Sequence, residues 1–137
     1  MHIAPGTRVG AYEVLSLLGK GGMGEVWKAH DSSLGRDVAL KLLPEAFIAD
    51  PERVARFKRE AQTLASLNHT HIAAIYGIHD ADGVSALVLE YVEGPTLAAM
   101  LARGALSTRD ALLIAMQIVE ALETAHEAGV IHRDLKP

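Results

Sequence analysis

The stretch YEVLSLLGKGGMGEVWKAH, residues 12–30, decides the fold class. A mostly apolar segment leads into the glycine-rich residues 19–24, and a second strand-like segment, residues 25–30, follows at once. A dinucleotide-binding fold would need a helix directly after these glycines, and a Walker loop would need Gly-Lys-Ser or Gly-Lys-Thr. Because both features are absent, residues 19–24 are predicted to form a turn between two antiparallel strands, with backbone N–H groups that can face phosphates. Taken alone, the motif is also compatible with an ordinary glycine-rich hairpin.

The rest of the chain extends this hairpin into an α+β arrangement, because strand patterns come first and helix patterns come later. Asp50 and Pro51 suit the cap and the first position of a helix, and Ser107 suits the cap of a longer one. Besides residues 12–18 and 25–30, the sequence predicts strands at residues 37–43, 72–79, 85–92 and 130–131, and helices starting at residue 51 and at residues 97–103 and 108–127.

Composition narrows the class of protein. The 137 residues include 13 Lys and Arg against 17 Asp and Glu, a net charge of −4, and half of them are hydrophobic. This hydrophobic content is sufficient to form a core and argues against disorder. The net negative charge argues against a protein that binds nucleic acid. Cysteine is absent, which excludes disulfides and thiolate metal sites. The apolar stretches are too short to span a bilayer, so we expect one cytoplasmic domain or part of a larger one.

Two charged residues break the apolar pattern. Lys41 lies within the strand-like residues 37–43, on the same face as Ala39 and Leu43. In the helix that follows, at about 100° per residue, the apolar side chains fall within an arc of about 140°, and Glu60 lies inside that arc. A buried charge is costly unless it is paired, so one interpretation is an ion pair between Lys41 and Glu60 beneath the glycine turn. The alternatives are a solvated edge strand for Lys41 and a boundary position that reaches water for Glu60.

The last six residues, HRDLKP at 132–137, give the sequence its family resemblance. With them the chain resembles a protein kinase, specifically a eukaryotic-type Ser/Thr kinase domain of the bacterial branch. Residues 19–26 match the family pattern G-x-G-x-x-G-x-V, residues 38–41 resemble V-A-I-K, and residues 132–135 match H-R-D-L. The resemblance implies a kinase-like α+β fold: a small lobe with an antiparallel five-stranded sheet and one packed helix, followed by the first helices of a truncated helical large lobe.

The same resemblance implies an ATP-binding site on the small lobe. The glycine turn would cover the ATP phosphates, and Lys41 would contact the α- and β-phosphates and pair with Glu60. Val26 and Ala39 would enclose the adenine ring, and Thr96 would approach the ribose. The residues that the resemblance assigns to ATP, including those of the hinge, are Leu18, Gly19, Lys20, Gly21, Gly22, Met23, Gly24, Val26, Ala39, Lys41, Leu89, Glu90 and Val92.

The resemblance assigns catalytic roles to Lys41, Glu60, Asp134 and Lys136. Asp134 would accept the proton of the substrate hydroxyl and orient its oxygen, and Lys136 would stabilise the charge that develops on the γ-phosphoryl group. A lysine at position 136 favours Ser/Thr over Tyr substrates. The remaining assignments are Arg133 as a partner of a phosphorylated activation loop, and Leu64, Ile75 and His132 as members of an internal hydrophobic column.

Seven histidines raise a metal-binding alternative. His69, His71 and His79 are near one another in sequence, but their spacing is not helical and no carboxylate or cysteine completes a recognisable set. No metal ligand is therefore predicted within the chain. The resemblance implies Mg²⁺ as a cofactor together with ATP, and the family pattern places the ligands of this ion after Pro137.

Because the family pattern continues past Pro137, we expect a fragment of a kinase domain. Its expected parts are a lead-in at residues 1–11, an ATP-binding small lobe at 12–92, and a hinge exit with the start of the large lobe at 93–137. The predicted function is transfer of the γ-phosphoryl group of ATP to a protein Ser/Thr hydroxyl by the complete protein, which can carry a membrane anchor elsewhere. The alternatives are a nucleotide-binding pseudokinase or truncated regulatory module without catalysis, and an interaction domain. One face of the helix at 108–127 is expected to be exposed.

Purified residues 1–137 are expected to show no phosphotransfer, because the Mg²⁺ ligands of the family pattern lie outside them. The measurement is transfer of labelled phosphate from ATP to a generic basic protein, with Asp134→Asn as the control. Transfer by the wild-type chain that Asp134→Asn abolishes would contradict this expectation.

Overall fold

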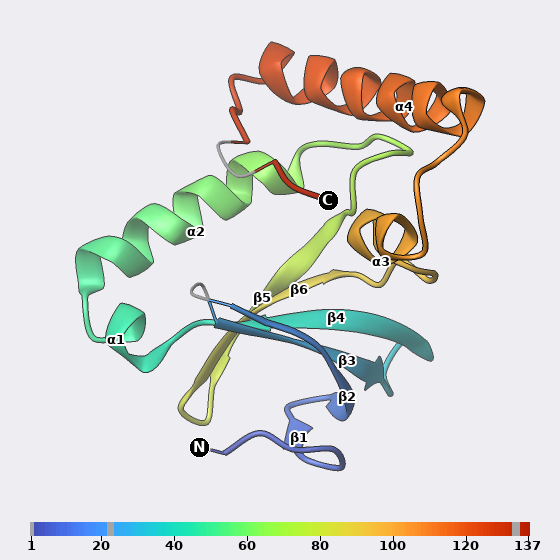
Figure 1. Ribbon diagram of the computed structural model, residues 1–137. Coiled ribbons are helices and arrows are strands. Elements are labelled where there is room, and N and C mark those ends of the chain that lie inside the picture. Colours follow the sequence, from blue (N-terminus) through green and yellow to red (C-terminus); the bar gives the residue numbers. More distant parts are fainter. Residues whose placement is uncertain (1, 22–23, 133–134) are drawn as a thin grey trace.

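The computed structural model describes residues 2–21, 24–132 and 135–137. An antiparallel six-stranded sheet with the order β1-β2-β3-β4-β6-β5 forms its centre, and helices lie around it (Figure 1). The α+β arrangement is therefore confirmed. The strands are β1 (Arg8–Val9), β2 (Tyr12–Gly21), β3 (Gly24–Asp31), β4 (Arg36–Leu42), β5 (Ile75–Ala81) and β6 (Val84–Glu90), and the helices are α1 (Glu45–Ile48), α2 (Pro51–Ala65), α3 (Leu97–Ala102) and α4 (Thr108–Glu127).

Two short elements were not expected, and one expected strand is not formed. The sheet has six strands instead of five, because the two-residue β1 pairs with β2, and the one-turn helix α1 precedes α2. Residues 130–131 are not a strand. The Val130 N–H donates to the Ala125 carbonyl at 2.9 Å, and Gly129 has φ +79°, so these residues close the C-terminus of α4.

The core lies on one face of the sheet. Strict alternation along β4 sends Val38 and Leu40 to this face, and both are fully buried. Val14 of β2 and Val88 of β6 pack into the same cluster. Ile3, ahead of the first strand, is also buried there, so the N-terminal segment contributes to the core of the sheet.

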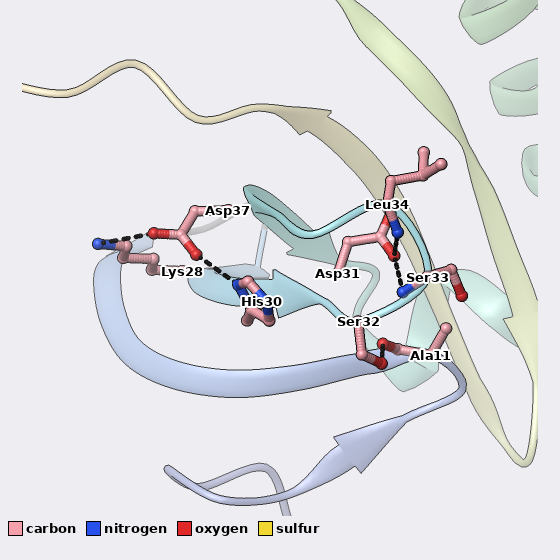
Figure 2. A network of polar contacts seen from close by, with 8 residues as sticks. All are labelled: Ala11, Lys28, His30, Asp31, Ser32, Ser33, Leu34 and Asp37. Atoms are coloured by element: carbon pink, nitrogen blue, oxygen red, sulfur yellow. Dashed lines mark hydrogen bonds and ion pairs between the residues drawn. The ribbon is translucent and has the colours of Figure 1, made fainter.

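The turn between β3 and β4 is fixed by a buried carboxylate. Asp31 accepts hydrogen bonds from the N–H groups of Ser33 and Leu34 at 2.9 and 3.2 Å, and only 5% of it is exposed. The Ser32 hydroxyl donates to the Ala11 carbonyl at 2.8 Å, which ties this turn to the start of β2 (Figure 2). These local bonds set the register in which β3 and β4 pair.

The caps predicted for two helices are confirmed. Asp50 accepts from the N–H groups of Glu52 and Arg53 at 3.1 and 3.3 Å at the start of α2. The Ser107 hydroxyl accepts from the Asp110 N–H at 3.1 Å at the start of α4. Both caps satisfy N–H groups that a helix leaves unpaired at its first turn.

Helix α4 has an exposed apolar face, as predicted. It lies at one end of the molecule, beyond the sheet (Figure 1). Leu112, Met116 and Val119 are 60%, 59% and 61% exposed. Within the part of the chain that the structure describes, no helix is both long and apolar enough to cross a membrane.

Replacing Leu40 with alanine is expected to lower the free energy of unfolding by about 2–5 kcal/mol, because the side chain is fully buried and its removal leaves a cavity. Urea denaturation followed by circular dichroism measures the change. The matched control is Leu34→Ala in the β3–β4 turn, where the side chain is 67% exposed and a change of at most about 0.5 kcal/mol is expected. Equal losses in the two variants would contradict the assignment of the core face.

Candidate nucleotide-binding site

Strand register places four of the predicted ATP residues on one face of the sheet. Val26 is the cross-strand partner of Lys41, and Ala39 is the partner of Leu89. Residues directly opposite one another on antiparallel strands point to the same side. Because side chains alternate along β4, this face is opposite to the one on which Leu40 is buried. Ala39 is 7% exposed, and the other three are half-buried.

The glycine turn joins β2 to β3, as predicted, and these strands pair as far as Gly21 and Gly24. Gly24 has φ +107°, and a Cβ atom there would collide with the carbonyl oxygen of Leu42 on β4. No atom lies within 4 Å of the position that a Cβ would take at Gly19 or Gly21. The glycine turn is therefore packed tightly at its β3 end and is open along its β2 end. Gly22 and Met23 lie outside the described residues.

A side-chain network braces the strands beside this turn. Lys20 forms an ion pair with Glu25 at 3.0 Å across β2 and β3, and the Trp27 Nε1–H donates to the same carboxylate at 3.0 Å. The hydrogen bond from Lys20, and then that from Trp27, hold the pKa of Glu25 below its usual value. Lys20 is therefore paired with a carboxylate beside the turn. Lys41 instead lies on the sheet face that it shares with Val26, Ala39 and Leu89.

The ion pair predicted between Lys41 and Glu60 is not formed. Glu60 is exposed to solvent, and the ion pairs among residues 2–21, 24–132 and 135–137 do not include one that joins it to Lys41. The alternative of a boundary residue that reaches water describes Glu60 correctly. The reason is the placement of α2, which packs along β5 and buries Ala61. Helix periodicity gives the angle between side chains but not the rotation of the whole helix on the sheet.

The hinge that the family resemblance predicts, residues 90–92, adjoins a cation that the sequence analysis did not identify. Lys28 lies over the ring of Tyr91, with its Nζ 4.6 Å from the ring centroid, and pairs with Asp37 at 3.3 Å. His30 contacts the other oxygen of Asp37 at 2.9 Å, as Figure 2 shows. The His30 hydrogen bond, followed by that from Lys28, lowers the pKa of Asp37, and the bond to Asp37 raises the pKa of Lys28. The sequence feature that could have revealed Lys28 is its position two residues after Val26, which puts both side chains on one face of β3.

The two predicted hinge residues differ in their surroundings. The Glu90 side chain accepts a hydrogen bond from the Ala74 N–H at 2.9 Å, and the Glu90 N–H donates to the Ala74 carbonyl at 2.8 Å. The end of β6 is thus tied to the segment before β5. Val92, two residues later, is 65% exposed. Leu18, at the other side of the site, is 46% exposed.

The predicted catalytic segment is at residues 132–137. Arg133 and Asp134 lie outside the described residues, and Lys136 and His132 are exposed. Leu64 and Ile75 are half-buried, so the exposed His132 does not share their environment as the predicted column requires. The Thr96 hydroxyl accepts a hydrogen bond from the Ala99 N–H at 3.1 Å and caps α3.

Two cavities are not lined by any of the four side chains Val26, Ala39, Lys41 and Leu89. A cavity of about 400 Å³ is lined by Ile3, Trp27 and Leu42, on the core side of the sheet, and one of about 430 Å³ lies between α2 and the β5–β6 hairpin. The His71 N–H donates to His69 Nδ1 at 3.0 Å. Over the residues that have described positions, no three His, Asp or Glu side chains gather as metal ligands.

Comparison with known proteins identifies the family. The protein kinase domain family matches residues 12–137. The chain belongs to this family. It is 48% identical over 133 residues to a probable serine/threonine-protein kinase of Streptomyces coelicolor, 43% identical over 129 residues to the kinase PrkC of Bacillus subtilis, and 46% identical over 137 residues to the kinase PknA of Mycobacterium tuberculosis. These matches cover 93%, 93% and 96% of this kinase-family chain.

The chain spans between a fifth and a third of the length of these curated relatives, with coverage of 20%, 20% and 32%. Among solved structures, the kinase domain of Mycobacterium tuberculosis PknI matches with a TM-score of 0.82 and 32% identity, over 99% of this chain and 56% of that one. Rad53 in complex with AMP-PNP matches with a TM-score of 0.80 and 28% identity, over 93% of this chain and 33% of that one. The predicted protein-kinase-like fold is therefore confirmed, and the family implies ATP and Mg²⁺ as cofactors.

Gly24→Ala is expected to lower the free energy of unfolding by at least about 1 kcal/mol, because φ +107° is unfavourable for an L side chain and the new methyl group meets the Leu42 carbonyl. Gly21→Ala is the matched control, since open space surrounds that position. Thermal denaturation of both variants measures the difference. A Gly24→Ala chain as stable as Gly21→Ala would mean that the turn does not pack against β4 in solution.

Proposed function

We propose that the protein carrying this domain is an ATP-dependent serine/threonine protein kinase, and that residues 12–92 are its nucleotide-binding small lobe. The observation that supports this most is the shared face of Val26, Ala39, Lys41 and Leu89, which strand register fixes next to the glycine turn. Small and branched apolar side chains suit a flat heterocycle, and an ammonium group suits phosphate oxygens. The residues of this face therefore fit ATP.

In this proposal the nucleotide lies along the face from the hinge to the glycine turn. Glu90 and Val92 would contribute backbone groups to the adenine edge, with Leu89 behind the ring. The backbone of residues 18–24 would bind the phosphates, because glycines allow close approach of N–H groups. Lys41 would hold phosphate oxygens as a point charge. Bound ATP supplies the phosphoryl group that is transferred.

The transfer step would depend on the segment at residues 132–137. Asp134 would accept the proton of a protein Ser/Thr hydroxyl and orient its oxygen, and Lys136 would stabilise the charge that develops in the transition state. Residues 93–137 would form the hinge exit and the start of the large lobe, and the Mg²⁺ ligands would come from later in the protein. The proposed location is the cytoplasm, where ATP and protein substrates are available.

Isothermal titration with AMP-PNP, with and without Mg²⁺, tests the nucleotide site in the 137-residue chain. Lys41→Met is expected to weaken AMP-PNP binding about tenfold or more, because it removes a charged hydrogen-bond donor to phosphate. Arg56→Met, an exposed cation on α2, is the matched control and should bind as the wild type does. The proposal fails if the wild-type chain does not bind the nucleotide, or if the Lys41 and Arg56 variants bind equally well.

A further inference from the structure

Helix α2 is tied to the sheet by a carboxylate on the β5–β6 hairpin. Lys58 Nζ donates to Asp80 Oδ2 at 3.1 Å, and the Ser85 hydroxyl donates to Asp80 Oδ1 at 2.7 Å. Asp80 and Ser85 are cross-strand partners on β5 and β6. Both carboxylate oxygens are therefore engaged, one by the neighbouring strand and one by the helix. Among the described residues, this is the ion pair that joins α2 to a strand.

Apolar packing holds α2 only weakly. Its buried residue is Ala61, which has a small side chain. The cavity of about 430 Å³ separates Val54 and Ala55 from the hairpin, and Lys58 and Asp80 also line it. Because the larger apolar side chains Val54, Phe57 and Leu64 are only half-buried, the rotation of the helix on the sheet can respond to a single polar contact.

Lys58 and Glu60 point in nearly opposite directions from the helix axis. Two residues apart, they are separated by about 160° around α2. A rotation that turns Glu60 toward β4 therefore moves Lys58 away from the hairpin. In this structure Lys58 contacts Asp80, and Glu60 is exposed. The Lys58–Asp80 pair and a Lys41–Glu60 pair thus require different rotations of the same helix.

We infer that Lys58 and Asp80 are positioning residues: their ion pair holds α2 in the rotation that keeps Glu60 away from Lys41, and its release favours the Lys41–Glu60 pair. This rests on the proposed function, in which the Lys41 ammonium group holds the phosphates, and on the role that the family resemblance gives Glu60 as the partner of that group. Both partners are about half exposed, with side-chain exposures of 47% and 52%. An exposed ion pair contributes little free energy, and a small difference is sufficient to shift the balance between two helix rotations of similar stability.

Carbodiimide cross-linking of the 137-residue chain tests this inference, because the reagent joins an ammonium and a carboxylate that are in contact. Mass spectrometry of the peptides measures each link. Asp80→Asn keeps the shape of the side chain and removes its charge, and it should raise the Lys41–Glu60 link about two- to fivefold. Asp82→Asn is the matched control. It makes the same charge change in the same hairpin, at an exposed residue with φ +56° that asparagine tolerates, and should leave the link unchanged.

A charge exchange separates positioning from a general loss of structure. Asp80→Lys alone should raise the Lys41–Glu60 link, and adding Lys58→Asp should return it to the wild-type level. Circular dichroism confirms that each variant is folded. A Lys41–Glu60 link equal in folded Asp80→Asn and Asp82→Asn chains, or one that the charge exchange fails to restore, would overturn the inference. Neither result alters AMP-PNP binding by the wild type, so failure here is distinguishable from failure of the proposed function.

Discussion

The pairing of β4 with β3 on one side and β6 on the other is the constraint on which the rest of the structure depends. Alternation along β4 sends Leu40 into the core and Ala39 and Lys41 to the opposite face. A slip of one residue in this pairing would exchange the two faces, placing an ammonium in the core and a leucine in the proposed nucleotide site. Burial of Leu40 therefore fixes which side chains form the proposed nucleotide face, so stability and the proposed function depend on the same register.

The helices are attached to this sheet much less firmly than the strands are to one another. Helix α2 buries one alanine and borders a cavity, and α4 has no buried residue. The proposed nucleotide face is thus built by backbone hydrogen bonds that cannot shift without breaking the sheet, whereas the position of Glu60 depends on side-chain contacts that each contribute little free energy. This division suits a kinase domain, because the proposed nucleotide face can stay in place while the proposed catalytic carboxylate of Glu60 moves.

Membership of the protein kinase family agrees with a firmly paired sheet and loosely attached helices. The motif at residues 38–41 lies on the buried part of β4, and the family match covers residues 12–137. The exposed apolar face of α4 has the composition of a surface that packs against further structure. Relatives that are three to five times as long carry further chain, as the coverage of 20% to 32% shows.

The sequence by itself determined the features that local chemistry controls. The Asp50 and Ser107 caps, the glycine turn without a following helix, and the shared face of Ala39 and Lys41 were predicted correctly, because each depends on residues within a few positions of one another. The two-residue strand β1 was missed because so short a segment has no periodicity, and residues 130–131 were misassigned because a helix cap uses the Val130 N–H.

Only the tertiary structure decided where Glu60 points. Periodicity gave its angle relative to the other side chains of α2, but the rotation of the helix depends on Lys58 meeting Asp80, 22 residues away on another element. Likewise, the spacing along β3 placed Lys28 on the same face as Val26, but only the tertiary structure brought it over the ring of Tyr91. Contacts of this kind arise from packing between distant segments, and the spacing of residues along one segment carries no information about them.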